Sequence, residues 1–162
     1  MKQNLTLTVT GVLAAFSLAT FLFAASPPAQ QASNLLNRLH DNAFKVRDWA
    51  DQLQAYDRVP TLVSWEMDAD ALDHMRTHIN RMDRILHRLQ TMEGSLPQDQ
   101  RLEINQIAPP MIELTNTTQI AIQFMRNHED LIFLPKYTAY LDQMFSEASR
   151  VERDSGTRPG RA

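Results

Sequence analysis

The chain has 162 residues, 43% of them hydrophobic, with 4 glycines, 8 prolines, no cysteine and a formal net charge of −3. The lack of cysteine excludes disulfides, thiolate zinc sites, cysteine nucleophiles and covalent c-type haem. Gly94 is the only glycine between Pro27 and Ser155. This argues against a glycine-rich phosphate loop and against sheets joined by tight turns. The mild negative charge argues against nucleic acid as a partner, because phosphate binding needs a basic face.

The first 32 residues differ in composition from the rest of the chain. Lys2 precedes a largely apolar stretch over residues 5–25, and Ala25, Ala29 and Ala32 are small residues that suit a cleavage point. A positive start, an apolar run and small residues form the pattern of an export signal. The run also has roughly the length of a membrane span, about 20 residues, so an uncleaved inner-membrane anchor through residues 5–25 is the alternative. We therefore expect a periplasmic or secreted bacterial protein with its signal or anchor in residues 1–32.

Four segments with helical periodicity follow, over residues 33–58, 65–93, 97–127 and 136–153. In each of them apolar residues recur at alternating spacings of three and four, which is the pattern of a helix-bundle seam. The first two seams are Leu36, Leu39, Ala43, Val46, Ala50 and Leu53, then Leu72, Met75, Ile79, Met82, Leu86 and Leu89. The third is Ile104, Ile107, Met111, Leu114, Thr118, Ala121 and Met125, and the fourth is Tyr137, Leu141, Met144, Ala148 and Val151.

Polar residues, glycine and proline mark the ends of these segments. Ser64 is placed to cap the second helix, and Gly94 is expected to end it as a left-handed residue. Pro97 suits the first turn of the third helix, where its missing N–H costs nothing. The third seam continues through Pro109 and Pro110, which predicts one helix with a kink there.

Short links between four helical segments predict antiparallel neighbours. We therefore expect an all-α protein, an up-down-up-down antiparallel four-helix bundle over residues 33–153, with the Pro-Pro kink in its third helix. Residues 154–162 are expected to form a disordered tail.

Histidines give one hypothesis for a site. His74 and His78 are four residues apart on one side of the second helix, which is a spacing found in metal sites, and His40 is expected at a similar height on the first helix. These three residues could bind a divalent metal, or His78 could bind haem b together with His40 or His74. The preferred interpretation is that they are boundary residues hydrogen-bonded to neighbours or water, so no cofactor is expected.

Arginines give a second hypothesis. Arg81, Arg84 and Arg88 share one face of the second helix, and guanidinium groups match phosphate and carboxylate geometry. The alternative is that acidic residues early in a helix and basic residues late in it suit the helix dipole, and the order of charges favours this explanation. An anion-binding face thus stays open as the less favoured interpretation.

No catalytic constellation is found in the sequence. Serines are few and none stands in a strand-turn-helix elbow, so no residue is assigned a catalytic role. A complete core pattern without such a constellation predicts a non-enzymatic protein that binds an unidentified protein or envelope component through a helix face.

Three stretches carry a resemblance. They are Val63 to Met82 with its Ser-Trp-Glu and His-x-x-x-His-Ile-Asn, Ile107-Ala-Pro-Pro-Met-Ile-Glu-Leu-Thr-Asn-Thr-Thr, and Pro135-Lys-Tyr-Thr-Ala-Tyr-Leu. Together they resemble exported helical proteins frequent in soil bacteria of the acidobacterial type, a group with no known activity. The group has an earlier histidine where this chain has Ala69 to Ala71. The resemblance implies export, a helical fold, and shared positions that include Trp65, Tyr137 and Tyr140.

Overall fold

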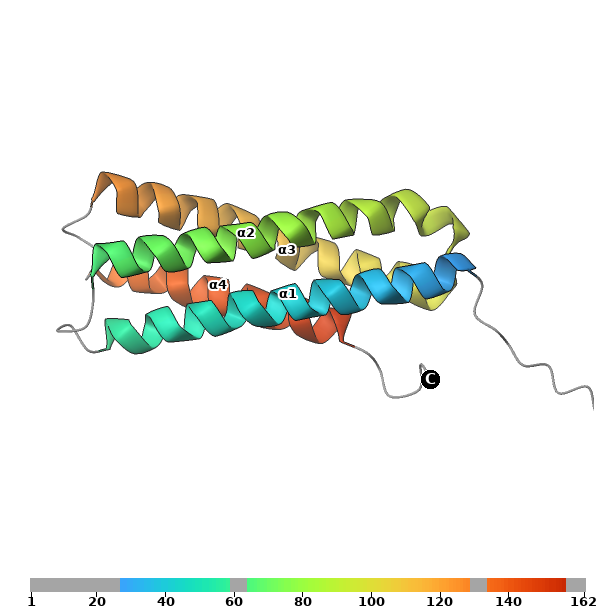
Figure 1. Cartoon of the computed structure of the whole chain (residues 1–162), viewed down its shortest axis with the longest axis horizontal. Helices are drawn as coiled ribbons and strands as arrows, with labels where there is room; N and C mark the ends of the chain where they lie inside the picture. The colour runs from blue at the N-terminus through green and yellow to red at the C-terminus, as the bar shows by residue number, and fades with distance from the viewer. Residues whose placement is uncertain (1–26, 59–63, 129–133, 157–162) are drawn as a thin grey trace, which may run out of the picture.

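Four long helices make up the protein. The computed structural model describes residues 27–58, 64–128 and 134–156. Its elements are α1 (Pro27–Asp57), α2 (Trp65–Met92), the short 3₁₀ helix η1 (Glu93–Ser95), α3 (Gln98–Asn127) and α4 (Pro135–Ser155). Successive helices run in opposite directions, and α1 packs against α2 and α4 while α3 packs against the same two (Figure 1). The predicted all-α, up-down-up-down four-helix bundle is confirmed.

The core is built from the predicted seams. Every residue of the four seams is buried, because the alternating three- and four-residue spacing keeps them on the inward side of each helix. Thr118 is a polar member of the seams, and its Oγ1 donates to Leu114 O at 2.8 Å and lies 3.2 Å from Met144 Sδ. The seams therefore form one continuous core along the bundle.

The first helix begins earlier than the sequence pattern predicts. It starts at Pro27 rather than Ser33, and Ala29 and Ala32 are buried. Gln100 Nε2 from α3 donates to Ala29 O and to Ser33 Oγ, both at 3.0 Å. Residues 27–32 are thus part of the bundle, and the predicted boundary at residue 33 is too late because alanines do not mark an apolar face as leucines do.

Both chain ends carry predictions that fall partly outside the described residues. The apolar stretch over residues 5–25 lies outside them, as do residues 157–162 of the predicted tail. Within the described ranges, no helix combines the length and apolarity needed to cross a membrane. The start of the predicted tail is instead helical, since Ser155 ends α4 with its side chain buried and its Oγ donating to Val151 O at 2.6 Å.

Two predicted features of the helix ends and interiors are confirmed. Ser64 caps α2, because its Oγ accepts a hydrogen bond from Met67 N at 3.2 Å. The α3 helix is continuous through Pro109 and Pro110, with Pro110 buried and Pro109 exposed, so the register of the seam is kept. The bend at this pair stays a prediction.

Gly94 does not end α2 in the way predicted. It lies within η1, its φ is outside the left-handed region, and a Cβ built on it would meet no heavy atom within 4 Å. The helix ends by tightening into a 3₁₀ turn, in which Leu96 N donates to Glu93 O at 3.1 Å and Ser95 Oγ donates to Met92 O at 2.8 Å. No left-handed residue is needed, because the extended Leu96 and then Pro97 redirect the chain.

Replacing Gly94 by alanine is therefore expected to stabilise the protein by about 0.4–1 kcal/mol, because the unfolded chain loses conformational freedom while the folded chain meets no clash. Urea denaturation monitored by circular dichroism measures the change. Gly156→Ala is a useful comparison, since a Cβ there would lie 3.4 Å from the carbonyl oxygens of Glu152 and Arg153. A loss of stability in Gly94→Ala would contradict the structural account of this turn.

Candidate functional site

A buried polar cluster closes the end of the bundle where α1 ends and α2 and α4 begin (Figure 1). Asp68 is 4% exposed and Tyr137 is 1% exposed, although both carry polar groups. Asp57, the last residue of α1, accepts a hydrogen bond from Thr138 Oγ1 at 2.6 Å. Asp57 thus connects the end of α1 to the start of α4.

Burial controls the charge state of this cluster. It raises the pKa of Asp68 from the ordinary value of 3.8 to about 6; a nearby Tyr137 hydroxyl opposes the increase and the negative charge of Asp57 adds to it. Burial also raises the pKa of Tyr137, and the Asp68 and Asp57 carboxylates act in the same direction. Tyr137 Oη nevertheless has no hydrogen bond of acceptable geometry, so its contact with Asp68 is electrostatic rather than a formed hydrogen bond. The cluster is poised to change charge near pH 6.

The tyrosines singled out by the resemblance converge on Phe124 of α3. The ring centroids of Tyr137 and Tyr140 lie 6.3 and 5.9 Å from that of Phe124, and Lys136 Nζ lies 5.6 Å from the same centroid. Trp65 is at the same end of the bundle but lines a hollow between α2 and α3. The sequence analysis did not identify Phe124, since it lies outside the third seam.

The three histidines of the metal hypothesis have separate partners. His40 Nδ1 lies 2.8 Å from Glu152 O on α4, and His78 Nδ1 lies 2.9 Å from Asn42 Oδ1 on α1. The His74 ring stacks on Trp49 with centroids 5.0 Å apart and planes within 2°. Each histidine ring therefore has a hydrogen-bonding or stacking partner of its own within the bundle.

A metal or haem site receives no support from this arrangement. Within the part of the chain that the structure describes, no three histidine, cysteine, aspartate or glutamate side chains form a group that could hold a metal ion. The residues proposed from sequence, His40, His74 and His78, all belong to that part. His40 contacts α4, whereas His74 and His78 contact different residues of α1, Trp49 and Asn42.

The arginines of α2, in contrast, do gather around one groove. A groove of about 520 Å³ between α1 and α2 is lined by Arg38, Asn42, Arg81, Asp83, Arg84, Ile85, His87 and Arg88. We call this set the arginine groove. It includes the three predicted residues and adds a fourth guanidinium group from α1, Arg38, which no pattern within α2 could indicate. Among the residues that the structure describes, these four guanidinium groups form no ion pair.

The helix dipole accounts for the first two acidic residues of α2 but not for its arginines. Glu66 and Asp68 lie in the first turn, where negative charge is favourable, whereas the last turn contains no basic residue. The influence of the dipole decays within a turn of the helix end. The helix dipole, which the order of charges favoured, therefore does not explain the positions of these arginines.

The neighbouring His78 is affected by positive charges beside the groove. Its pKa is lowered, first by burial and then by the positive charges of Arg81, Lys45 and His74. His78 is therefore a neutral hydrogen-bonding partner of Asn42 at neutral pH, and it leaves the positive charge of this face to the arginines and Lys45.

No family model matches the chain, and no curated protein or solved structure matches it either.

Proposed function

We propose that this protein is a non-enzymatic binding protein of the bacterial envelope, periplasmic or secreted, and that its arginine groove holds a phosphate-bearing envelope component. One observation carries the proposal. Four guanidinium groups from two helices surround one groove without ion pairs among the described residues, on a chain whose net charge is −3. Positive charge concentrated in a groove attracts anions and raises their local concentration there.

Phosphate is the chemistry that suits the groove. Guanidinium groups bind phosphate oxygens through paired hydrogen bonds, and Arg38 faces the three arginines of α2 from the other helix. Asp83 is the single acidic residue of the lining. The volume of about 520 Å³ lies within the range of ligand pockets, roughly 300–1,000 Å³. The open position of the groove implies that binding weakens with salt.

Envelope location rests on the amino-terminal pattern. Lys2, the apolar residues 5–25 and the alanines after them favour export. Burial of Ala29 and Ala32 favours cleavage after Ala25, because cleavage at either later alanine would remove part of α1. Mass spectrometry of the protein recovered from its native host would test export and locate the cleavage point.

The binding test uses two phosphate sources. Vesicles of phosphatidylcholine with and without phosphatidylglycerol probe lipid headgroups, and inorganic pyrophosphate probes free phosphate. We expect saturable binding to at least one source, and a roughly tenfold weakening when Arg84 is replaced by glutamine, because a charge-assisted hydrogen bond contributes about 1.5 kcal/mol or more. Binding to phosphatidylglycerol vesicles alone would identify the lipid as the source.

The matched control is Arg101→Gln on α3, an exposed arginine outside the groove. It should leave binding unchanged, whereas Arg38→Gln should weaken binding as Arg84→Gln does. Equal effects of Arg101→Gln and Arg84→Gln would show a general charge effect and overturn the proposal, as would the absence of binding to both sources.

A further inference from the structure

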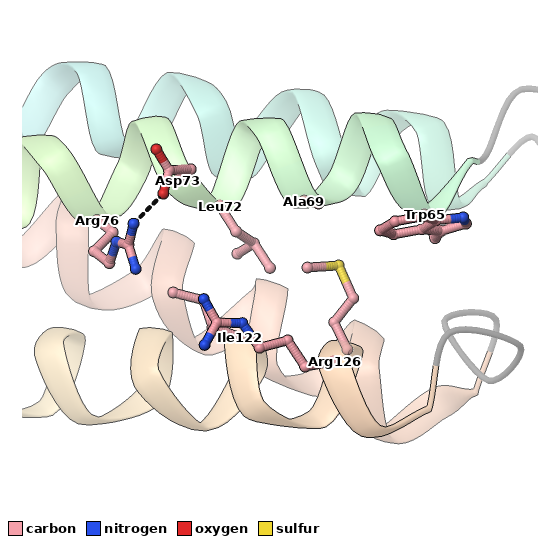
Figure 2. Close-up of a pocket in the computed structure, with 8 residues that line it drawn as sticks. Trp65, Ala69, Leu72, Asp73, Arg76, Ile122 and Arg126 are labelled. Atoms are coloured by element: carbon pink, nitrogen blue, oxygen red, sulfur yellow. Dashed lines mark hydrogen bonds and ion pairs between the residues drawn. The ribbon is translucent and has the colours of Figure 1, made fainter.

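A second hollow lies between α2 and α3, away from the arginine groove. It has a volume of about 290 Å³ and is lined by Trp65, Ala69, Leu72, Asp73, Arg76, Ile122, Met125 and Arg126 (Figure 2). The α2–α3 pair is the least closely packed of the four adjacent helix pairs. The small side chain of Ala69 leaves space where a larger residue would fill the gap between the helices.

The hollow has an apolar part and a charged part. In Figure 2, Trp65 lies at one end, Leu72 and Ala69 are on the α2 side, and the side chains of Arg76 and Arg126 lie toward the other end. Trp65 remains 41% exposed. An exposed tryptophan at the mouth of an apolar hollow is typical of a surface that gains stability when a ligand covers it.

The charges at the far end are unbalanced. Arg76 pairs with Asp73, whereas Arg126 has no carboxylate partner within the described residues. Two guanidinium groups and one carboxylate therefore give the hollow a net positive end. A guanidinium group without a partner favours a carboxylate ligand, which it binds through two parallel hydrogen bonds.

We propose that this hollow binds a small amphipathic carboxylate, with its apolar body against Trp65, Leu72 and Ile122 and its carboxylate on Arg126. The volume of about 290 Å³ is at the lower limit of ligand pockets, which restricts the ligand to a small molecule. Arg76 adds positive charge at the same end, but its pairing with Asp73 makes Arg126 the principal anchor. This site shares no residue with the arginine groove and does not depend on the function proposed for it.

The test uses the fluorescence of Trp65. The chain has two tryptophans, and Trp49 stacks on His74 outside the hollow, so Trp49→Phe leaves Trp65 as the single reporter. Octanoate is the probe, and 1-octanol is the matched ligand without charge. We expect a saturable shift of Trp65 emission with octanoate, and about tenfold weaker binding of 1-octanol.

Variants separate the two halves of the hollow. Arg126→Gln should weaken octanoate binding about tenfold and leave 1-octanol binding unchanged. Ala69→Leu should abolish binding of both ligands by filling the hollow, with circular dichroism confirming the fold, and Arg101→Gln should change neither. Equal binding of octanoate by the parent and Arg126→Gln proteins, equal affinity for both ligands, or no saturable shift would each overturn the proposal.

Discussion

Replacement of Asp68 by asparagine is expected to raise the free energy of unfolding at pH 7.5 by up to about 3 kcal/mol, a large gain for a single substitution. The buried carboxyl has a pKa of about 6 in the folded protein, against 3.8 ordinarily. At pH 7.5 folding therefore carries the cost of an ionised carboxylate with 4% exposure at the end of the core. Asparagine keeps the size of the side chain and removes the charge.

The sign of the pH dependence follows from the raised pKa. Between about pH 4 and pH 6 the folded protein binds more protons at Asp68 than the unfolded chain does, so this carboxyl makes stability fall as the pH rises through that window. Above about pH 7 the cost is complete and constant. Near pH 4 the parent and Asp68→Asn proteins should differ by less than about 1 kcal/mol.

Urea unfolding of both proteins from pH 4 to pH 8 measures this difference. Burial also raises the pKa of Glu147, but that carboxyl is present in both proteins and its contribution cancels in the subtraction. Asp51→Asn is the control, since Asp51 is an exposed aspartate of α1. A stability difference that does not change with pH would show that Asp68 has the same protonation in the folded and unfolded chains, contrary to the expected result.

The seams could be predicted because they need only local information. A helix places residues three and four apart on one face, so Leu36 and Leu39, or Ile104 and Ile107, indicate the buried side without knowledge of the partner helix. The turn at Gly94 could not be predicted, because glycine is compatible with both a 3₁₀ ending and a left-handed ending. The early start of α1 was missed because Ala29 and Ala32, although buried, mark an apolar face less clearly than leucines do.

The polar cluster was predictable in part. Asp68 stands four residues before Leu72 and so continues the α2 seam, as Asp57 continues the α1 seam four residues after Leu53. Seam positions near one end of the bundle that carry aspartates, opposite Tyr137, are a signal for a buried titratable group. Their proximity itself depends on which helix ends meet, and this is a property of the tertiary fold.

The arginine groove was also predictable only in part. The face formed by Arg81, Arg84 and Arg88 follows from helix geometry, but Arg38 joins it only because of how α1 is rotated against α2. The helix dipole gives these arginines little support, since α2 ends at Met92 and Arg88 lies before its last turn, as the predicted range of 65–93 already implied.

A chain that begins at Ser33 is expected to be at least about 2 kcal/mol less stable than one that begins at Ser26. It lacks the buried Ala29 and Ala32, and it loses the Ala29 carbonyl that accepts from Gln100 Nε2 at 3.0 Å. Gln100 is 4% exposed and its Oε1 has no hydrogen-bond partner, and in the shorter chain its Nε2 keeps only Ser33 Oγ, at 3.0 Å, as an acceptor. The lost hydrogen bond contributes about 1 kcal/mol, to which the lost apolar burial adds.

A second substitution separates the amide from the lost packing. Gln100→Met keeps the length of the side chain without its polar atoms, so it should destabilise the longer chain by about 1 kcal/mol and stabilise the shorter one. Gln98→Met, at an exposed position in the same turn of α3, should affect the two chains equally. The same sign of the Gln100→Met effect in both chains, measured by urea unfolding, would mean that residues 27–32 do not hold this amide. The reversal of sign would instead establish that the bundle needs these residues.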